Sequence, residues 1–202
     1  MIPVLILAAG TSTRMGRPKA TLALDATDTF LSRIIRTFQD AAVEDVVVVL
    51  GHEAAAVVES VERAGLTARF VLNERYEAGQ LSSLQTGLNA IDRPAVTAML
   101  LTLVDVPLVS AATVRAVLER YRSTRAPVVR PVRGAQHGHP VLIDRSLFDK
   151  IRAADPRHGA KQVVRAHVTA AGDVEVDDEG AFCDIDTPDE YQRMVELRRD
   201  TR

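Results

Sequence analysis

Short apolar runs alternate with longer amphipathic stretches along the first 125 residues of the chain. The runs are rich in Val, Ile and Leu and nearly continuous, which is typical of strands that are covered on both faces. Repeated strand–helix–strand order predicts a parallel sheet with right-handed crossovers. The predicted strands are residues 2–8, 45–50, 68–72 and 97–104, and the predicted helices are residues 29–42, 53–64, 82–91 and 110–122.

The pattern changes after Ala126, where two short apolar runs flank a loop rich in Gly and His. This arrangement predicts two strands, 127–132 and 140–144, joined by residues 133–139. Helical segments follow near 145–154 and 159–167, and a strand-like stretch at 173–176 leads into residues 182–185. We expect Cys183 to be a small buried residue of a strand there. The last helix begins at Thr187, with Pro188 in its first turn and Glu190 completing a capping box.

The chain of 202 residues contains no internal repeat, low-complexity tract or linker, so we expect one α/β domain over residues 1–202. The predicted architecture is a three-layer, Rossmann-like fold with a mostly parallel sheet and helices on both faces.

Composition excludes several classes of protein. A net charge of −2 argues against a broad nucleic-acid surface, and no apolar run approaches the roughly 20 residues of a membrane span. The apolar beginning of the chain is interpreted as a strand and not as a signal peptide. Cys183 is the only cysteine, which excludes intrachain disulfides and cysteine-rich zinc sites. These absences favour a cytoplasmic location.

The segment from Gly10 to Lys19 follows the first predicted strand and is rich in small residues. Such loops let main-chain N–H groups approach phosphate oxygens, and Arg14 and Lys19 add positive charge beside them. The loop lacks the Gly-Lys-Ser/Thr of a Walker A motif and the Gly-x-Gly-x-x-Gly of dinucleotide sites. It therefore predicts a phosphate site of another kind.

Two carboxylates are candidates for a Mg²⁺ site. Asp105 ends a hydrophobic strand, and Ser110 is the better N-cap for the next helix. Asp105 is therefore not needed as a cap and can bind a cation. Asp184 and Asp186 alternate in strand spacing and should point to opposite faces. We expect Asp186 to join Asp105 at the metal and Asp184 to be structural.

Two further segments have weaker signals. Ser82 and Gln85 have capping-box spacing, so a helix should begin there, and Gly79 just before it could meet a base or a ribose. His137 and His139 flank Gly138, but no third and fourth metal ligands are evident. A loop that faces the substrate is the better interpretation.

Taken together, these residues resemble the molybdenum cofactor cytidylyltransferases, within the molybdopterin-guanylyltransferase-like nucleotidyltransferases. The segment Leu7-Ala-Ala-Gly-Thr-Ser-Thr-Arg-Met-Gly-Arg-Pro-Lys19 closely matches the signature loop, and the likeness covers nearly the whole chain. Val104-Asp-Val-Pro107, Gly138-His-Pro-Val-Leu142 and Asp184-Ile-Asp-Thr-Pro188 are similar to the other motifs, whereas Gly79-Gln-Leu-Ser-Ser-Leu84 departs from the usual cytidylyltransferase run near the nucleobase.

The resemblance implies the transfer of a nucleotidyl group from an NTP, CTP in the first place, to a phosphorylated acceptor such as molybdopterin. It implies a nucleotide-binding part in residues 1–125, and in residues 126–202 an acceptor-binding part with the second metal ligand. It also implies a Mg²⁺ cofactor and transient contact with a molybdoenzyme or its chaperone. The implied roles are catalytic for Arg14 and Lys19; nucleotide-binding for Leu7, Ala8, Ala9, Gly10, Thr11, Arg14, Lys19, Gly79, Ser82 and Ser83; acceptor-binding for Gly138 and His139; and metal-binding for Asp105 and Asp186.

Two alternatives remain open. The first is a nucleotidyltransferase that acts on a sugar phosphate, an alditol phosphate or a phospho-acid. The second is a non-catalytic module that binds nucleotides or chaperones a cofactor. The pair of carboxylates argues against the second alternative, because a module that only binds a nucleotide needs no metal pair.

Overall fold

β1 (Val4–Ala8) lies in the middle of a mixed eight-stranded sheet in the computed structural model, which describes residues 1–200. It pairs in parallel with β2 (Val46–Leu50) and with β4 (Ala98–Leu103), and β2 pairs in parallel with β3 (Arg69–Leu72). Every residue of β1 and β2 is buried. These parallel pairs confirm the predicted parallel sheet. Continuous apolar runs of this kind need cover on both faces.

The sheet becomes antiparallel beyond β4. β7 (Val141–Asp144) runs antiparallel to both β4 and β5 (Val128–Arg133), as expected for two strands joined by a loop. The predicted loop contains the short β6 (Gln136–His137), and β8 (Asp173–Glu175) pairs in parallel with β5. The strand order is β3-β2-β1-β4-β7-β5-β6, with β8 beside β5.

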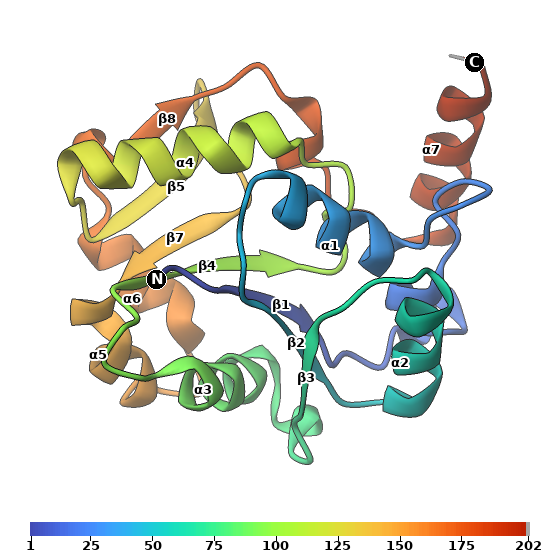
Figure 1. The fold of residues 1–202 in the computed structure, drawn as a ribbon, viewed down its shortest axis with the longest axis horizontal. Helices are drawn as coiled ribbons and strands as arrows, with labels where there is room; N and C mark the ends of the chain where they lie inside the picture. Colours follow the sequence, from blue (N-terminus) through green and yellow to red (C-terminus); the bar gives the residue numbers. More distant parts are fainter. Residues whose placement is uncertain (201–202) are drawn as a thin grey trace.

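Helices cover both faces of the sheet, which gives the three layers that the sequence predicts (Figure 1). Within residues 1–200 no helix is both long enough and apolar enough to cross a membrane. One face carries α1 (Phe30–Asp40), α2 (Ala54–Arg63) and α4 (Ala111–Thr124), and the other carries α3 (Gln80–Ile91), α5 (Phe148–Arg152) and α6 (Gly159–His167).

The side chains of β1 alternate between the two hydrophobic cores, one on each face of the sheet. Val4 and Ile6 pack with the layer of α1, α2 and α4, and Leu5 and Leu7 pack with the layer of α3. Full burial of such a side chain contributes about 1.5–3 kcal/mol. β1 is therefore firmly placed, and the loop that follows it starts from a fixed point.

The start of α3 differs from the prediction. The helix begins at Gln80, and its N-cap is Gly79, which makes no side-chain capping bond. The Ser82 hydroxyl contacts the carbonyl oxygens of Arg75 and Gly79, and the Gln85 amide donates to carbonyl oxygens in α5. The predicted capping box was wrong, because tertiary partners engage both side chains.

The expectation of a buried Cys183 in a strand was also wrong. Residues Glu179–Phe182 form a short 3-10 helix, and Cys183 after it is exposed. Ile185 is the residue that turns inward, into a small core that it shares with Phe30 and Met194. The segment is irregular because its hydrogen bonds go to neighbouring loops and not to a strand.

The beginning of α7 (Pro188–Asp200) confirms the predicted capping box. The Thr187 hydroxyl accepts from the N–H of Glu190 at 3.3 Å, and the Glu190 carboxylate accepts from the N–H of Thr187 at 2.8 Å. This reciprocal pair fixes the direction in which the chain enters the last helix.

Candidate active site

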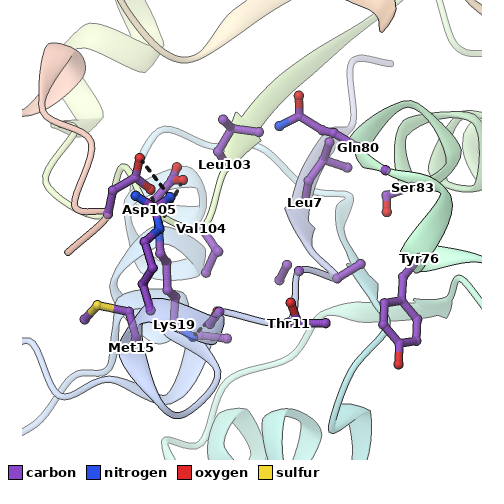
Figure 2. A pocket seen from close by; sticks show the side chains of 18 of the residues that line it. Leu7, Thr11, Met15, Lys19, Tyr76, Gln80, Ser83, Leu103, Val104 and Asp105 are labelled. Atoms are coloured by element: carbon purple, nitrogen blue, oxygen red, sulfur yellow. Dashed lines mark hydrogen bonds and ion pairs between the residues drawn. The ribbon is translucent and has the colours of Figure 1, made fainter. Parts of the chain in front are cut away.

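A cavity of about 430 Å³ opens at the carboxyl ends of β1 and β4, where ligands bind in sheets of this kind (Figure 2). The loops that follow these two strands form one wall, and the start of α3 forms the other. The predicted site residues that line the cavity are Leu7, Ala8, Ala9, Gly10, Thr11, Arg14, Lys19, Gly79, Ser83, Asp105 and Asp186.

The loop after β1 folds back on itself before it reaches Lys19. Ser12 adopts a left-handed conformation with φ of 50°, and its carbonyl accepts from the N–H of Met15 at 2.8 Å. The Ser12 hydroxyl accepts from the N–H of Lys19 at 3.0 Å. A Cβ placed on Gly10 would meet no atom within 4 Å, so the space above the loop is open. The loop thus borders open space, as loops that receive phosphate groups do.

Lys19 lies between the two predicted metal ligands. Its Nζ is 2.5 Å from Asp186 Oδ1 and 3.4 Å from Asp105 Oδ2, and its side chain is only 11% exposed. Arg14 is 65% exposed and reaches Asp186 Oδ2 at 3.7 Å. In Figure 2 the Lys19 side chain extends from the loop to Asp105. The four side chains form one charge cluster in the wall of the cavity.

Asp105 is the more deeply placed carboxylate, with 21% of its side chain exposed. It lies two residues after the end of β4, and Ser110 caps α4 as predicted by accepting from the N–H of Thr113. Burial raises the pKa of Asp105, an effect that the ammonium of Lys19 partly offsets. Its Oδ1 atom is buried and has no hydrogen-bond partner among residues 1–200. Lys19 contacts Oδ2, so the other oxygen of this carboxylate is left without a partner in the described part of the chain.

Asp186 is held mainly through its backbone. The N–H of Ile185 donates to the carbonyl of Asp105 at 2.9 Å, which ties together the two segments that carry the carboxylates. The Glu190 carboxylate accepts from the N–H of Asp186 at 2.8 Å. The hydrogen bond from Lys19 lowers the pKa of Asp186. The carboxylate is therefore anionic at neutral pH, and its side chain is 42% exposed.

The opposite wall begins at Gly79, whose φ of 98° and ψ of 177° belong to a region that glycine almost alone adopts. Tyr76 precedes it, and Gln80 and Ser83 follow it on α3 (Figure 2). Ser82 does not line the cavity. The buried amide of Asn73 donates to the hydroxyls of Ser82 and Ser83, which fixes the first turn of the helix.

The two predicted acceptor residues lie outside this cavity. Gly138 is buried where a Cβ would lie 2.3 Å from the carbonyl oxygen of Ala181, so close packing requires a glycine there. His139 is half-buried, with Nδ1 3.4 Å from the carbonyl oxygen of Leu101. Burial lowers the pKa of His139, and the carboxylates of Asp184 and Asp105 oppose that effect.

Sequence reasoning missed Glu190 as a support of Asp186, although the capping box had singled out this residue for α7. It also missed several residues of the cavity wall, some of which lie inside the quoted motifs without having been singled out there. These residues are Ser12, Met15, Ala20, Tyr76, Glu77, Gln80, Leu103 and Val104.

The carboxylate pair fits a hard cation that completes its shell with other ligands. Within residues 1–200 no group of three or more His, Cys, Asp or Glu side chains is arranged to hold a metal. Mg²⁺ commonly takes one or two carboxylates and fills its remaining positions with waters and substrate phosphates. The unpartnered Oδ1 of Asp105 is consistent with this mode of binding.

Comparison with known proteins places this geometry in context. A protein-family model described as the MobA-like NTP transferase domain matches residues 4–171. The nicotine blue oxidoreductase of Paenarthrobacter nicotinovorans is 31% identical over 208 residues, covering 95% of each chain. A probable molybdenum cofactor guanylyltransferase of Opitutus terrae is 33% identical over 129 residues, which are 64% of this chain and 60% of that protein.

A solved structure extends the likeness to the whole fold. Rv0371c of Mycobacterium tuberculosis, in complex with manganese, superimposes with a TM-score of 0.72 at 28% identity. The superposition covers 96% of this chain and 98% of that one.

Proposed function

The chain belongs to the MobA-like NTP transferase family, and we propose that it transfers a nucleotidyl group from an NTP, CTP in the first place, to a phosphorylated acceptor such as molybdopterin. One observation carries the proposal. Lys19, Asp105 and Asp186 meet in one wall of a cavity, beside a glycine-containing loop at the carboxyl ends of parallel strands. Anionic phosphates and a divalent cation need that combination of charges.

The reaction we propose is attack by an acceptor oxygen on the α-phosphorus of the NTP. The bond between the α-phosphorus and its bridging oxygen to the β-phosphate breaks, and pyrophosphate leaves. Such chemistry needs alignment and charge stabilisation and no protein nucleophile.

Five residues of the first wall have named roles in that alignment. The main chain around Gly10 holds the β- and γ-phosphates. Arg14 and Lys19 balance negative charge on the α-phosphate and on the departing pyrophosphate. Asp105 and Asp186 hold the metal ion, for which we propose Mg²⁺. When bound, the ion supplies Lewis-acid polarisation of phosphate oxygens and orients the chain of phosphates.

The second wall is the proposed seat of the base and ribose. Gly79, Ser82 and Ser83 belong to this part, with Ser82 acting through the first turn of α3. We propose CTP because the motifs, taken together, resemble those of the molybdenum cofactor cytidylyltransferases. GTP is the rival nucleotide, since the Opitutus terrae relative is named as a guanylyltransferase.

The acceptor side of the proposal rests on residues 126–202, and the nucleotide side on residues 1–125. Nearly all residues that line the cavity precede residue 126, and Asp186 is the exception. Gly138 and His139 stay proposed acceptor contacts. Transient contact with a molybdoenzyme or its chaperone and a cytoplasmic location belong to the same proposal.

The test is a panel of four NTPs against molybdopterin, sugar phosphates, alditol phosphates and phospho-acids, read by pyrophosphate release with and without Mg²⁺. We expect CTP with molybdopterin to give the highest rate. A preliminary screen asks which NTP raises the melting temperature in the presence of Mg²⁺. Nucleotide binding without Mg²⁺-dependent pyrophosphate release from any pair would identify a binding module and contradict the proposal.

A second candidate function follows from the full-length relative in Paenarthrobacter nicotinovorans, which is named as an oxidoreductase. The same protein preparation should be assayed for reduction of nicotine blue in the presence of a supplied electron donor. Reduction of the dye in the absence of any NTP turnover would favour this function over nucleotidyl transfer.

A further inference from the structure

Lys19 occupies the place where the proposed function needs a metal ion. Its ammonium contacts one oxygen of each carboxylate, Asp186 Oδ1 at 2.5 Å and Asp105 Oδ2 at 3.4 Å. The proposed function also needs this ammonium at the phosphates of the NTP. A single ammonium cannot neutralise both carboxylates and also stabilise the phosphate charge while a divalent ion binds the same carboxylates.

We propose that Lys19 is an exchangeable internal cation. In the nucleotide-free protein it holds Asp105 and Asp186 together, and when metal and NTP arrive it leaves them for the phosphates. The inference rests on the proposed function, because it assigns the carboxylates to a metal and the ammonium to the nucleotide.

The backbone around the cluster favours movement of the ammonium over movement of the carboxylates. The segments that carry the carboxylates are tied by the bond from the N–H of Ile185 to the carbonyl of Asp105, and the N–H of Asp186 is held by Glu190. Lys19 is held through its own N–H by the Ser12 hydroxyl, which leaves a flexible four-carbon stem to carry the charge.

Lys19 also leaves one carboxylate oxygen of the cluster without a partner in the described chain. Asp105 Oδ1 is buried and has no hydrogen-bond partner among the residues described, so Lys19 does not satisfy the pair completely. Arg14, at 3.7 Å from Asp186 Oδ2, is largely exposed and does not fill the place between the carboxylates. A metal ion bound there would displace one closely held ammonium, and the exposed Arg14 guanidinium would stay beside Asp186.

Exchange has a thermodynamic signature. Metal alone must displace Lys19 without giving the ammonium a new partner, so it should bind weakly. Nucleotide supplies that partner, and therefore metal and nucleotide should each raise the affinity for the other by the same factor. Replacing Lys19 by an uncharged residue should improve binding of the metal alone while it impairs turnover.

The experiment measures Mn²⁺ binding to the nucleotide-free protein by the electron paramagnetic resonance of free Mn²⁺. The variants are Lys19→Met and the matched control Lys150→Met, which removes an exposed lysine on α5. We expect Lys19→Met to bind Mn²⁺ at least ten-fold more tightly than the unaltered protein, and Lys150→Met to bind it equally. Adding Asp105→Asn to Lys19→Met should abolish the gain.

Saturating CTP or GTP, whichever raises the melting temperature, gives the second readout. The factor by which nucleotide tightens Mn²⁺ binding should be smaller in Lys19→Met than in the unaltered protein. Circular dichroism checks that the variant is folded, and Lys19→Gln replaces it if Lys19→Met does not fold.

Equal or weaker Mn²⁺ binding by the folded Lys19 variant overturns the exchange, and so does a gain that survives Asp105→Asn. Pyrophosphate release by the unaltered protein separates this result from the proposed function. Turnover without tighter binding in the variant leaves the proposed function and removes the exchange. Tighter Mn²⁺ binding by the variant without turnover of any NTP removes nucleotidyl transfer and leaves the competition between Lys19 and a metal ion.

Discussion

The two segments that carry the candidate metal ligands are built in different ways. Asp105 follows β4, whose first three residues are fully buried, so hydrophobic packing sets its position. Asp186 lies in an irregular segment after a short 3-10 helix, and hydrogen bonds to Glu190 and through Ile185 set its position. The difference teaches that a site of this kind can combine a rigid half with a half that depends on a few polar contacts.

The two carboxylates also differ in their environments, since Asp105 is more buried and Asp186 more exposed. Burial raises the pKa of Asp105, whereas the hydrogen bond from Lys19 lowers that of Asp186. We therefore expect Asp105 to contribute more to catalysis, because an interaction in a partly desolvated place is screened less by water. The following predictions test this ranking, in order of decreasing effect.

Asp105→Asn should lower kcat/KM by about 100-fold, or about 2.7 kcal/mol, because the partly buried metal ligand loses its charge. Steady-state pyrophosphate release measures this effect. The matched control is Asp184→Asn, an exposed neighbour of the site that does not line the cavity, and it should change the rate by less than about three-fold. Equal losses in the two variants would remove the distinction between the two segments.

Gly180→Ala should lower the free energy of unfolding by roughly 2 kcal/mol, as overpacking commonly does. A Cβ at this position would lie 2.1 Å from the carbonyl oxygen of Leu108, so the segment leading to Asp186 must move away from the loop after β4. Urea unfolding measures the change. Gly10→Ala is the control for stability, since its Cβ meets nothing within 4 Å. A stability of Gly180→Ala equal to that of the unaltered protein would show that the two loops adapt freely.

Lys19→Ala should slow turnover more than ten-fold, or over about 1.4 kcal/mol of barrier, because positive charge at the phosphates is lost. Lys150→Ala, on the exposed side of α5, should leave the rate unchanged. An unchanged kcat/KM in Lys19→Ala would count against the assignment of the whole charge cluster.

Glu190→Ala should destabilise the protein by about 1 kcal/mol, the usual loss for a helix cap. It should also raise the Mg²⁺ concentration needed for half-maximal rate, because the backbone of Asp186 loses its acceptor. Glu190→Gln keeps an acceptor oxygen and should recover most of both effects. Glu196→Ala, exposed on the same helix, is the control. A metal requirement that stays constant in Glu190→Ala would show that the Ile185 contact is sufficient.

The same contrast explains what the sequence could predict. The four parallel strands lie within two residues of their predicted bounds. Short, continuous apolar runs are typical of strands that are covered on both faces, so their position can be predicted from the sequence. Both bounds of α6 agree with the prediction. The meeting of the loop after β1 with Asp105 followed from the rule that carboxyl ends of parallel strands share one edge.

The parts that could not be predicted depend on contacts between distant residues. The Lys19–Asp186 pair spans 167 positions, and no local pattern indicates it. The predicted start of α3 differs from the observed one because Gly79 caps the helix without a side chain. The Ser82 hydroxyl donates instead to the carbonyl oxygen of Arg75, before the helix. Residues 182–185 alternate like a strand, but their partners are loops, which periodicity does not reveal.

Glu190 accepts hydrogen bonds from the N–H groups of both Asp186 and Thr187, which has a practical consequence for handling the protein. A protease cut or an engineered stop just after Thr187 would spare every residue that lines the cavity, yet it would release the backbone of Asp186. The same cut would remove Met194 from the small core that it shares with Phe30 and Ile185, so the segment that carries Asp186 would lose its apolar support as well.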